Sequence, residues 1–254
     1  MATEYDLTRI RHDLLGKGLL RSIDFVESTG STNADLLAAR PSDGAVLLAG
    51  EQTAGRGRLG RRWESPAGDQ LIFSLGLVVD EARVKRLGTL PLAVGAGVAD
   101  AVVGVAPNAG LKWPNDVLID GRKLAGILAE AAPLEAGKYH VVVGCGINTG
   151  MPAERLPVAH ATSLRVCDIE FDQEKLAVAV LGSVEKRVQQ WRADDPQMLQ
   201  DYRQHCVTIG QRVKLETPRG EIVGLAETVD DEGCVVVDGQ AYSAGDVTHL
   251  RPRQ

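Results

Sequence analysis

Residues 52–69 separate two apolar runs, 45–51 and 70–79, that each have the length and composition of a buried strand. The intervening segment cannot form a useful helix, because Pro66 and Gly68 interrupt it. It is rich in small and basic residues, namely Gly55, Gly57, Gly60, Arg56, Arg58, Arg61 and Arg62. The sequence therefore predicts two strands joined by a long glycine–arginine loop.

This loop contains a literal G-x-G-x-x-G match from Gly55 to Gly60, and Asp80 follows 20 residues later. A dinucleotide site needs a helix directly after the glycines, with its N-terminus facing the pyrophosphate. The breakers after Gly60 exclude that helix. Gly50 and Gly55 have the spacing of a P-loop, but Arg56-Gly57 stands where Lys-Ser/Thr is needed. Neither nucleotide motif is supported.

The loop instead favours an anionic ligand. The chain as a whole is acidic, with a net charge of −6, so four arginines in one loop are unusual. Glycines let backbone amides approach an anion, and guanidinium groups bind phosphate through paired donors. We predict phosphate binding here, with a solvated basic loop as the alternative. The composition also suggests the hypothesis that the loop is disordered without ligand.

Around the loop, the periodicity predicts an α+β chain. Helices are expected over 5–20, from Ser31, over 84–105, over 172–193 and from Pro196 to Tyr202. Strands are expected at 22–28, 123–132 and 139–147, and a strand, a turn and a second strand over 111–120. Residues 148–163 are expected to be a loop. Short strands with turn signals fill 207–250, as in a small β-barrel or sandwich. We place a domain boundary near residue 205.

Composition excludes several classes of protein. Apolar residues make up 44% and charged residues 24%, as in soluble globular proteins. The four cysteines form no C-x-x-C pair and the five histidines are scattered, which argues against a zinc site or a disulfide framework. No run approaches a membrane span, and the N-terminus lacks the apolar segment of a signal peptide. We expect a cytoplasmic protein that does not bind membranes.

Several motifs in a fixed order resemble those of biotin–protein ligases. They are Ser31-Thr32-Asn33, then 51–61 (EQTAGRGRLGR), 112–116 (KWPND), 123–128 (KLAGIL) and 144–148 (GCGIN). The resemblance runs from about residue 22 to the C-terminal β segment. It implies a mixed β-sheet flanked by helices, related to class II aminoacyl-tRNA synthetases, in a catalytic domain of residues 1–205. An SH3-like β-barrel would occupy residues 206–254.

The resemblance also implies two reaction steps. Biotin and Mg-ATP give biotinyl-5′-AMP and pyrophosphate, and the adenylate is then attacked by a carrier lysine. No protein nucleophile is needed, so orientation and charge stabilisation would carry the catalysis. The catalytic residues implied are Lys112, Arg56 and Arg58. The two arginines would stabilise charge at the α-phosphate, and Lys112 would bridge it to the biotin carboxylate.

The binding residues implied for biotin are Ser31, Thr32, Asn33, Gln52, Gly55, Arg56, Gly57, Arg58, Lys112, Gly126 and Leu128. A urea ring needs donors and acceptors in a mostly apolar pocket. Ser31-Thr32-Asn33 also fits a plain helix N-cap, and both roles can coexist.

The residues implied for ATP or the adenylate are Arg56, Arg58, Arg61, Trp63, Lys112, Asn115, Lys123 and Asn148. Asn148 suits the edge of adenine, because an amide both donates and accepts. Asp116 is a candidate metal ligand for Mg²⁺. Some family members pack a tryptophan on adenine in the segment after residue 148, but residues 149–165 hold no aromatic. Leu156 or Leu164 is the expected substitute.

The implied partner is the biotin carboxyl carrier domain of an acetyl-CoA, acyl-CoA or pyruvate carboxylase. Only about 20 residues precede the first matched strand, too few for the DNA-binding domain that some members carry, so a repressor role is not expected. We expect a monomer or a weak homodimer.

Three alternatives stay open. One is a lipoate–protein ligase or octanoyl transferase, which shares the fold. Another is a catalytically silent, biotin-responsive regulator. An RNA-associated tail is the third, although residues 207–254 contain Tyr242 as their one aromatic.

Overall fold

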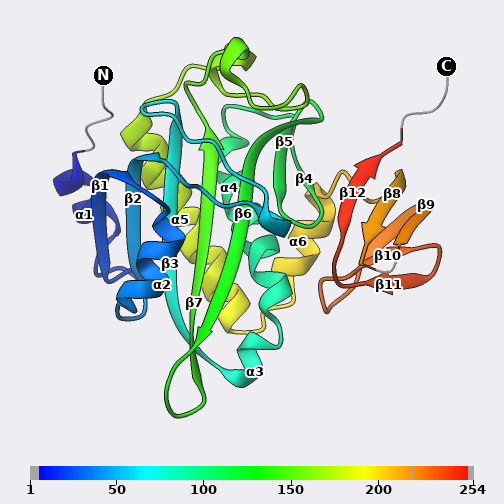
Figure 1. Ribbon diagram of the computed structural model, residues 1–254, viewed down its shortest axis with the longest axis horizontal. Helices are drawn as coiled ribbons and strands as arrows, with labels where there is room; N and C mark the ends of the chain where they lie inside the picture. The colour runs from blue at the N-terminus through cyan, green and yellow to red at the C-terminus, as the bar shows by residue number, and fades with distance from the viewer. Residues whose placement is uncertain (1–5, 219, 251–254) are drawn as a thin grey trace.

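The computed structural model describes residues 6–218 and 220–250 (Figure 1). Its helices are α1 (Leu7–Leu14), α2 (Thr32–Ala39), α3 (Glu81–Val84), α4 (Leu90–Val102), α5 (Gln173–Arg192) and α6 (Gln197–His205). The strands of the larger part are β1 (Ser22–Thr29), β2 (Ala45–Gln52), β3 (Gln70–Asp80), β4 (Ala109–Lys112), β5 (Asp116–Ile119), β6 (Arg122–Pro133) and β7 (Lys138–Asn148). The smaller part holds β8 (Arg212–Thr217), β9 (Gly220–Val229), β10 (Val235–Val237), β11 (Gln240–Tyr242) and β12 (Asp246–His249).

The larger sheet has seven strands in the order β1-β2-β3-β7-β6-β5-β4. β1 pairs with β2 in parallel and all other neighbours are antiparallel, so the sheet is mixed. The smaller sheet is antiparallel, in the order β11-β10-β9-β8-β12, and lies beyond the β4 edge of the large one (Figure 1). The α+β class with a flanked mixed sheet is confirmed.

Helices cover the two faces of the large sheet unequally. α4 packs against both the sheet and α5, and the main core lies between them. The close approach depends on Gly97, where a Cβ atom would lie 2.7 Å from Val184 Cα. The opposite face carries α2, under which Leu36, Leu47 and Val142 form a small separate cluster. The rest of that face is left for the loop over residues 53–69.

Most expected elements are present within two or three residues of the predicted ends. Two helices differ. The one expected over 5–20 ends at Leu14, because Gly16 adopts a positive φ of 77° that does not continue a helix. The one expected over 84–105 is divided into α3, a short 3-10 turn (Leu87–Thr89) and α4. Pro91 explains the division, because it stands in the first turn of α4, where a missing N–H costs nothing. Among the described residues, no helix combines the length and apolarity needed to cross a membrane.

His140 on β7 gives a testable pH dependence. Its side chain is fully buried, and neither ring nitrogen has a hydrogen-bond partner among residues 6–218 and 220–250. Burial, with a contribution from Arg40, lowers its pKa, and Asp43 opposes the shift. The folded protein thus binds a proton at His140 more weakly than the unfolded chain. The contribution of His140 to the free energy of unfolding is therefore fully present above about pH 6.5 and is lost as the pH falls below that value.

We expect acidification from pH 7.5 to pH 5.5 to destabilise the wild type more than His140→Leu. The difference should reach at most about 1.4 kcal/mol per pH unit. Urea unfolding at both pH values measures it. Parallel losses in the two proteins would show that His140 titrates normally.

Candidate active site

A cavity of about 360 Å³ opens on the face of the large sheet that carries α2. Its walls come from the start of α2, the glycine–arginine loop, the β4–β5 turn, strands β6 and β7, and β12 of the smaller sheet. The predicted residues that line it are Ser31, Thr32, Asn33, Gln52, Arg56, Gly57, Arg58, Arg61, Trp63, Lys112, Asn115, Asp116, Lys123, Gly126 and Leu128. Segments far apart in the sequence are therefore brought together as predicted.

One end of the cavity is polar and uncharged. The Thr32 backbone N–H and hydroxyl both donate to Gln52 Oε1, at 2.8 and 3.0 Å. The Ser74 hydroxyl lies 2.6 Å from Asn33 Oδ1 and 2.7 Å from Thr32 Oγ1. Ser31 caps α2 through a 3.5 Å contact to the Ala34 N–H, so the capping prediction is confirmed. The result is a network of donors and acceptors with fixed orientation.

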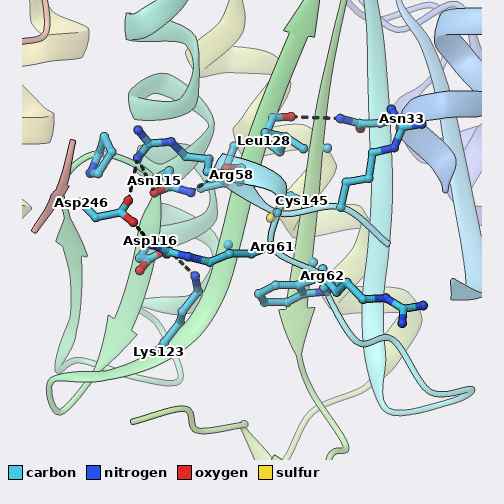
Figure 2. A pocket seen from close by; sticks show the side chains of 18 of the residues that line it. Asn33, Arg58, Arg61, Arg62, Asn115, Asp116, Lys123, Leu128, Cys145 and Asp246 are labelled. Carbon is cyan, nitrogen blue, oxygen red and sulfur yellow. Dashed lines mark hydrogen bonds and ion pairs between the residues drawn. The ribbon is translucent and has the colours of Figure 1, made fainter. Parts of the chain in front are cut away.

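Leu128 lines the cavity beside this end, and its carbonyl accepts from Asn33 Nδ2 at 3.2 Å (Figure 2). Gly144 on β7 pairs with Leu128, and Gly146 pairs with Gly126. A Cβ atom at Gly144 would lie 2.2 Å from Asn33 Oδ1, and one at Gly146 would lie 2.4 Å from Trp63 Nε1. Glycine at both positions lets Asn33 and Trp63 pack directly on the strands.

The other end is cationic. Lys123 Nζ lies 2.6 Å from Asp116 Oδ1, and Lys112 Nζ lies 3.9 Å from Asp116 Oδ2. Burial lowers the pKa of Lys112, although Asp116 partly offsets the effect. The Lys123 ammonium also lies 5.4 Å from the centre of the Trp63 ring. Two ammonium groups thus share one carboxylate (Figure 2 shows the Lys123 pair).

The arginines of the loop are paired with oxygen atoms. Arg58 Nη1 donates to Asn115 Oδ1 at 3.3 Å and lies 3.7 Å from Asp246 Oδ1, and Arg61 pairs with the same aspartate (Figure 2). Arg56 pairs with Glu130 at 3.2 Å. Burial lowers the pKa of Arg58, yet it stays cationic at neutral pH. Backbone bonds such as Trp63 N–H to the Gly55 carbonyl fold the loop back on itself.

Two predicted residues lie outside the cavity lining. Gly55, within the loop, packs against the Trp63 backbone, where a Cβ atom would be 2.4 Å from the Trp63 carbonyl oxygen. Asn148 is buried, accepting from Gln70 Nε2 at 2.8 Å and donating to the Thr162 carbonyl at 2.9 Å. Gln70 in turn accepts from Trp63 Nε1 at 3.1 Å. Asn148 therefore reaches the cavity through Gln70 and Trp63.

The proposed substitutes for an adenine-packing aromatic, Leu156 and Leu164, are also absent from the cavity lining. Leu164 is fully buried in the main core. Trp63 is the aromatic residue whose indole meets the cavity beside Lys123.

Sequence reasoning missed several residues of the site. Ser74 and Glu130 each interrupt an apolar strand run, a signal that could have identified them. Asp246, with Glu216, Val247 and Thr248, comes from the smaller sheet, and no local pattern indicates that it faces the cavity. Cys145 lines the cavity too, but burial raises its thiol pKa and keeps it protonated.

Asp116 does not sit in a metal-binding cluster. Within the described ranges, no group of three or more His, Cys, Asp or Glu side chains is arranged to hold a metal ion. The nearest charged partners of Asp116 are the two lysines, which disfavour a cation there.

A cavity with an uncharged polar end, a cationic end and an arginine loop is what an enzyme needs to join a small carboxylic acid to a nucleotide phosphate. The chain belongs to the biotin/lipoate A/B protein ligase family, whose model matches residues 22–148. Residues 208–250 match the biotin protein ligase C-terminal domain. The resemblance read from the sequence is thereby confirmed, as is the small SH3-like domain.

Similar proteins agree with this assignment. The chain is 46% identical to biotin--[acetyl-CoA-carboxylase] ligase of Mycobacterium tuberculosis, over 97% of this chain and 96% of the relative. It is 31% identical to the bifunctional ligase/repressor BirA of Bacillus subtilis, over 90% of this chain and 72% of that protein. The structure of Aquifex aeolicus biotin protein ligase in complex with biotin and ATP is similar, with 26% identity, a TM-score of 0.76, and coverage of 92% of this chain and 100% of that chain.

Proposed function

We propose that this protein is an ATP-dependent biotin–protein ligase. In the first step a carboxylate oxygen of biotin attacks the α-phosphate of ATP, which forms biotinyl-5′-AMP and releases pyrophosphate. In the second, a lysine amine of a carrier domain attacks the acyl carbon, which forms an amide and releases AMP. The observation that carries the proposal is a single cavity with an uncharged polar end and another end that holds two ammonium groups. The 46% identity to the M. tuberculosis ligase supports it.

The polar end fits the ureido ring of biotin. Thr32, Asn33 and Gln52 line it with hydroxyl and amide groups, which suits an uncharged urea. The buried Ser74 hydroxyl holds Thr32 and Asn33 from behind. Leu128 lines the next stretch and fits the apolar ring and tail. Ser31 and Gly57 also line the cavity.

Strand register supports a position for the carboxylate end of biotin. The Gly126–Gly146 pair is two residues, about 7 Å, along the strands from the Leu128–Gly144 pair. A Cβ atom at Gly126 would lie 3.2 Å from Lys123 Nζ. We therefore propose Lys123 as the ammonium nearest the biotin carboxylate. Lys112, predicted from sequence to bridge carboxylate and phosphate, lies on the far side of Asp116 and fits the α-phosphate better.

The loop fits the polyphosphate. Arg58 and Arg61, with Arg56 at the outer edge, can exchange their carboxylate partners for phosphate oxygens as charge builds on the α-phosphate. A loop that covers the cavity also keeps water from the mixed anhydride. Trp63 offers a flat surface for the adenine base, with Asn148 supporting it through Gln70. Asn115 holds Arg58.

Mg²⁺ fits this scheme as part of the substrate Mg-ATP. Magnesium commonly binds through one or two carboxylates and the substrate phosphates, and keeps several waters. Asp116, flanked by two lysines, suits the orientation of Lys123 better than the binding of a metal. The chemistry supplied by the ion would be neutralisation of phosphate charge.

We propose a biotin carboxyl carrier domain as the protein substrate, in line with the name of the M. tuberculosis relative. Acetyl-CoA, acyl-CoA and pyruvate carboxylases all stay candidates. A monomer or weak homodimer, a cytoplasmic location and a domain boundary between residues 205 and 206 also stay predictions; the last agrees with the end of α6 at His205.

The test is ATP–pyrophosphate exchange with biotin or lipoate as the acid. We expect exchange with biotin and at most a few per cent of that rate with lipoate, because the polar end matches a urea. Transfer of biotin to a purified carrier domain tests the second step. Exchange with lipoate alone would keep the fold and change the substrate. Tight biotin binding without exchange would indicate a regulator.

A further inference from the structure

Glu130 on β6 lies between the polar end of the cavity and the glycine–arginine loop without lining the cavity itself. Its side chain is 26% exposed, and both of its oxygens are engaged. Oε1 lies 3.2 Å from Arg56 Nη1, and Oε2 accepts from Asn33 Nδ2 at 2.9 Å. One carboxylate thus touches a loop arginine and a residue of the polar end at once.

Asn33 is held in one orientation by these contacts. Its Nδ2 donates to Glu130 and to the Leu128 carbonyl, so Oδ1 is left to accept from Ser74. The residue is only 4% exposed. Any ligand that fills the polar end meets this amide. A ligand that restricts Asn33 also restricts the carboxylate to which Asn33 donates.

We propose that Glu130 is a positioning residue that couples occupancy of the polar end to the seating of the glycine–arginine loop. The inference rests on the proposed function, in which the polar end takes biotin and the loop takes ATP. A carboxylate ordered by Asn33 costs less conformational entropy when Arg56 pairs with it. The coupling is reciprocal, so a seated Arg56 also strengthens biotin binding.

The first test uses Glu130→Gln. The amide oxygen of glutamine can still accept from Asn33, but the charge that attracts Arg56 is gone. Glu135→Gln is the matched control, because Glu135 is an exposed carboxylate just beyond the end of the same strand. The rate of tryptic cleavage within the loop measures how firmly the loop is held over the cavity, since trypsin cleaves after its arginines. Biotin affinity is measured by calorimetry without ATP.

We expect biotin to slow tryptic cleavage within residues 52–69 by about tenfold in the wild type and in Glu135→Gln, but by less than twofold in Glu130→Gln. Biotin affinity should fall about three- to tenfold in Glu130→Gln alone. A purely structural role for Glu130 would lower the thermal midpoint and leave the protection factor unchanged. Undiminished protection, or tighter biotin binding, in Glu130→Gln would overturn the proposal.

A double-mutant cycle with Arg56→Ala tests the same coupling from the loop side. If Glu130 acts through Arg56, adding Glu130→Gln to Arg56→Ala should change loop cleavage with biotin by less than about 1.5-fold. If the effects of the two substitutions on loop cleavage multiply in the double variant, the coupling is overturned. Biotin-dependent pyrophosphate exchange in the wild type is measured first: exchange without loop protection overturns the coupling alone, whereas absence of exchange overturns the proposed function.

Discussion

Lys123→Ala is expected to lower biotin-dependent ATP–pyrophosphate exchange by about 100- to 1,000-fold, the usual cost of removing a group that stabilises charge in the transition state. The ammonium lies beside Gly126, where the biotin carboxylate is proposed to sit, and Asp116 holds it there at 2.6 Å. Initial rates at saturating biotin and ATP measure the effect.

Lys112→Ala is the informative comparison. Its ammonium is 3.9 Å from Asp116 and its pKa is lowered by burial, so it is a genuine second candidate. We expect a smaller loss, about tenfold, expressed mainly in the KM for ATP. Lys138→Ala, at the exposed start of β7, controls for net charge. A larger loss in Lys112→Ala than in Lys123→Ala would reverse the two assignments and restore the prediction made from sequence.

Gly144→Ala is expected to weaken biotin binding by about 10- to 100-fold, the range expected when a well-packed site is overfilled. Its new methyl group would fall 2.2 Å from Asn33 Oδ1, and three hydrogen bonds hold Asn33 in place. Calorimetry with biotin alone measures the loss. The expected defect in ATP binding is small.

Gly146→Ala, two residues along the same strand face, provides the contrast. Here the methyl group meets the Trp63 indole at 2.4 Å, and Trp63 belongs to a loop that can shift. We expect the KM for ATP to rise more than the biotin dissociation constant. If both glycine variants lose biotin and ATP binding equally, the division of the cavity into a biotin end and a nucleotide end is wrong.

Local patterns were sufficient for most of the fold. Alternation and apolar runs located the strands of the large sheet, and Ser31 marked the start of α2. The break before α4 was missed, because the apolar stripe over 84–105 outweighed Pro91 in the interpretation. Tertiary packing determines where this helix begins, because α4 is buried along most of its length and the preceding turns only connect it to β3.

The site residues likewise divide into those that local sequence patterns identify and those that depend on tertiary packing. Residues in the long motifs were found, because each motif keeps its residues close in the sequence. Ser74 and Glu130 were missed, although each is a polar residue within an apolar strand. Asp246 could not be found this way, since its meeting with Arg58 depends on how the small sheet docks beyond the β4 edge. The relative importance of Lys112 and Lys123 also depends on strand register, which the motifs do not state.

The contribution of Asp246 to the cavity wall limits how such a protein can be assembled from parts. A chimera that combines residues 1–205 with the small domain of another family member exchanges one wall of the site along with the tail. Such a chimera needs a carboxylate that reaches both Arg58 and Arg61. Compatibility between two parent proteins should therefore depend more on these three side chains than on overall sequence identity. The carboxylate and the two arginines have to be transplanted or redesigned together.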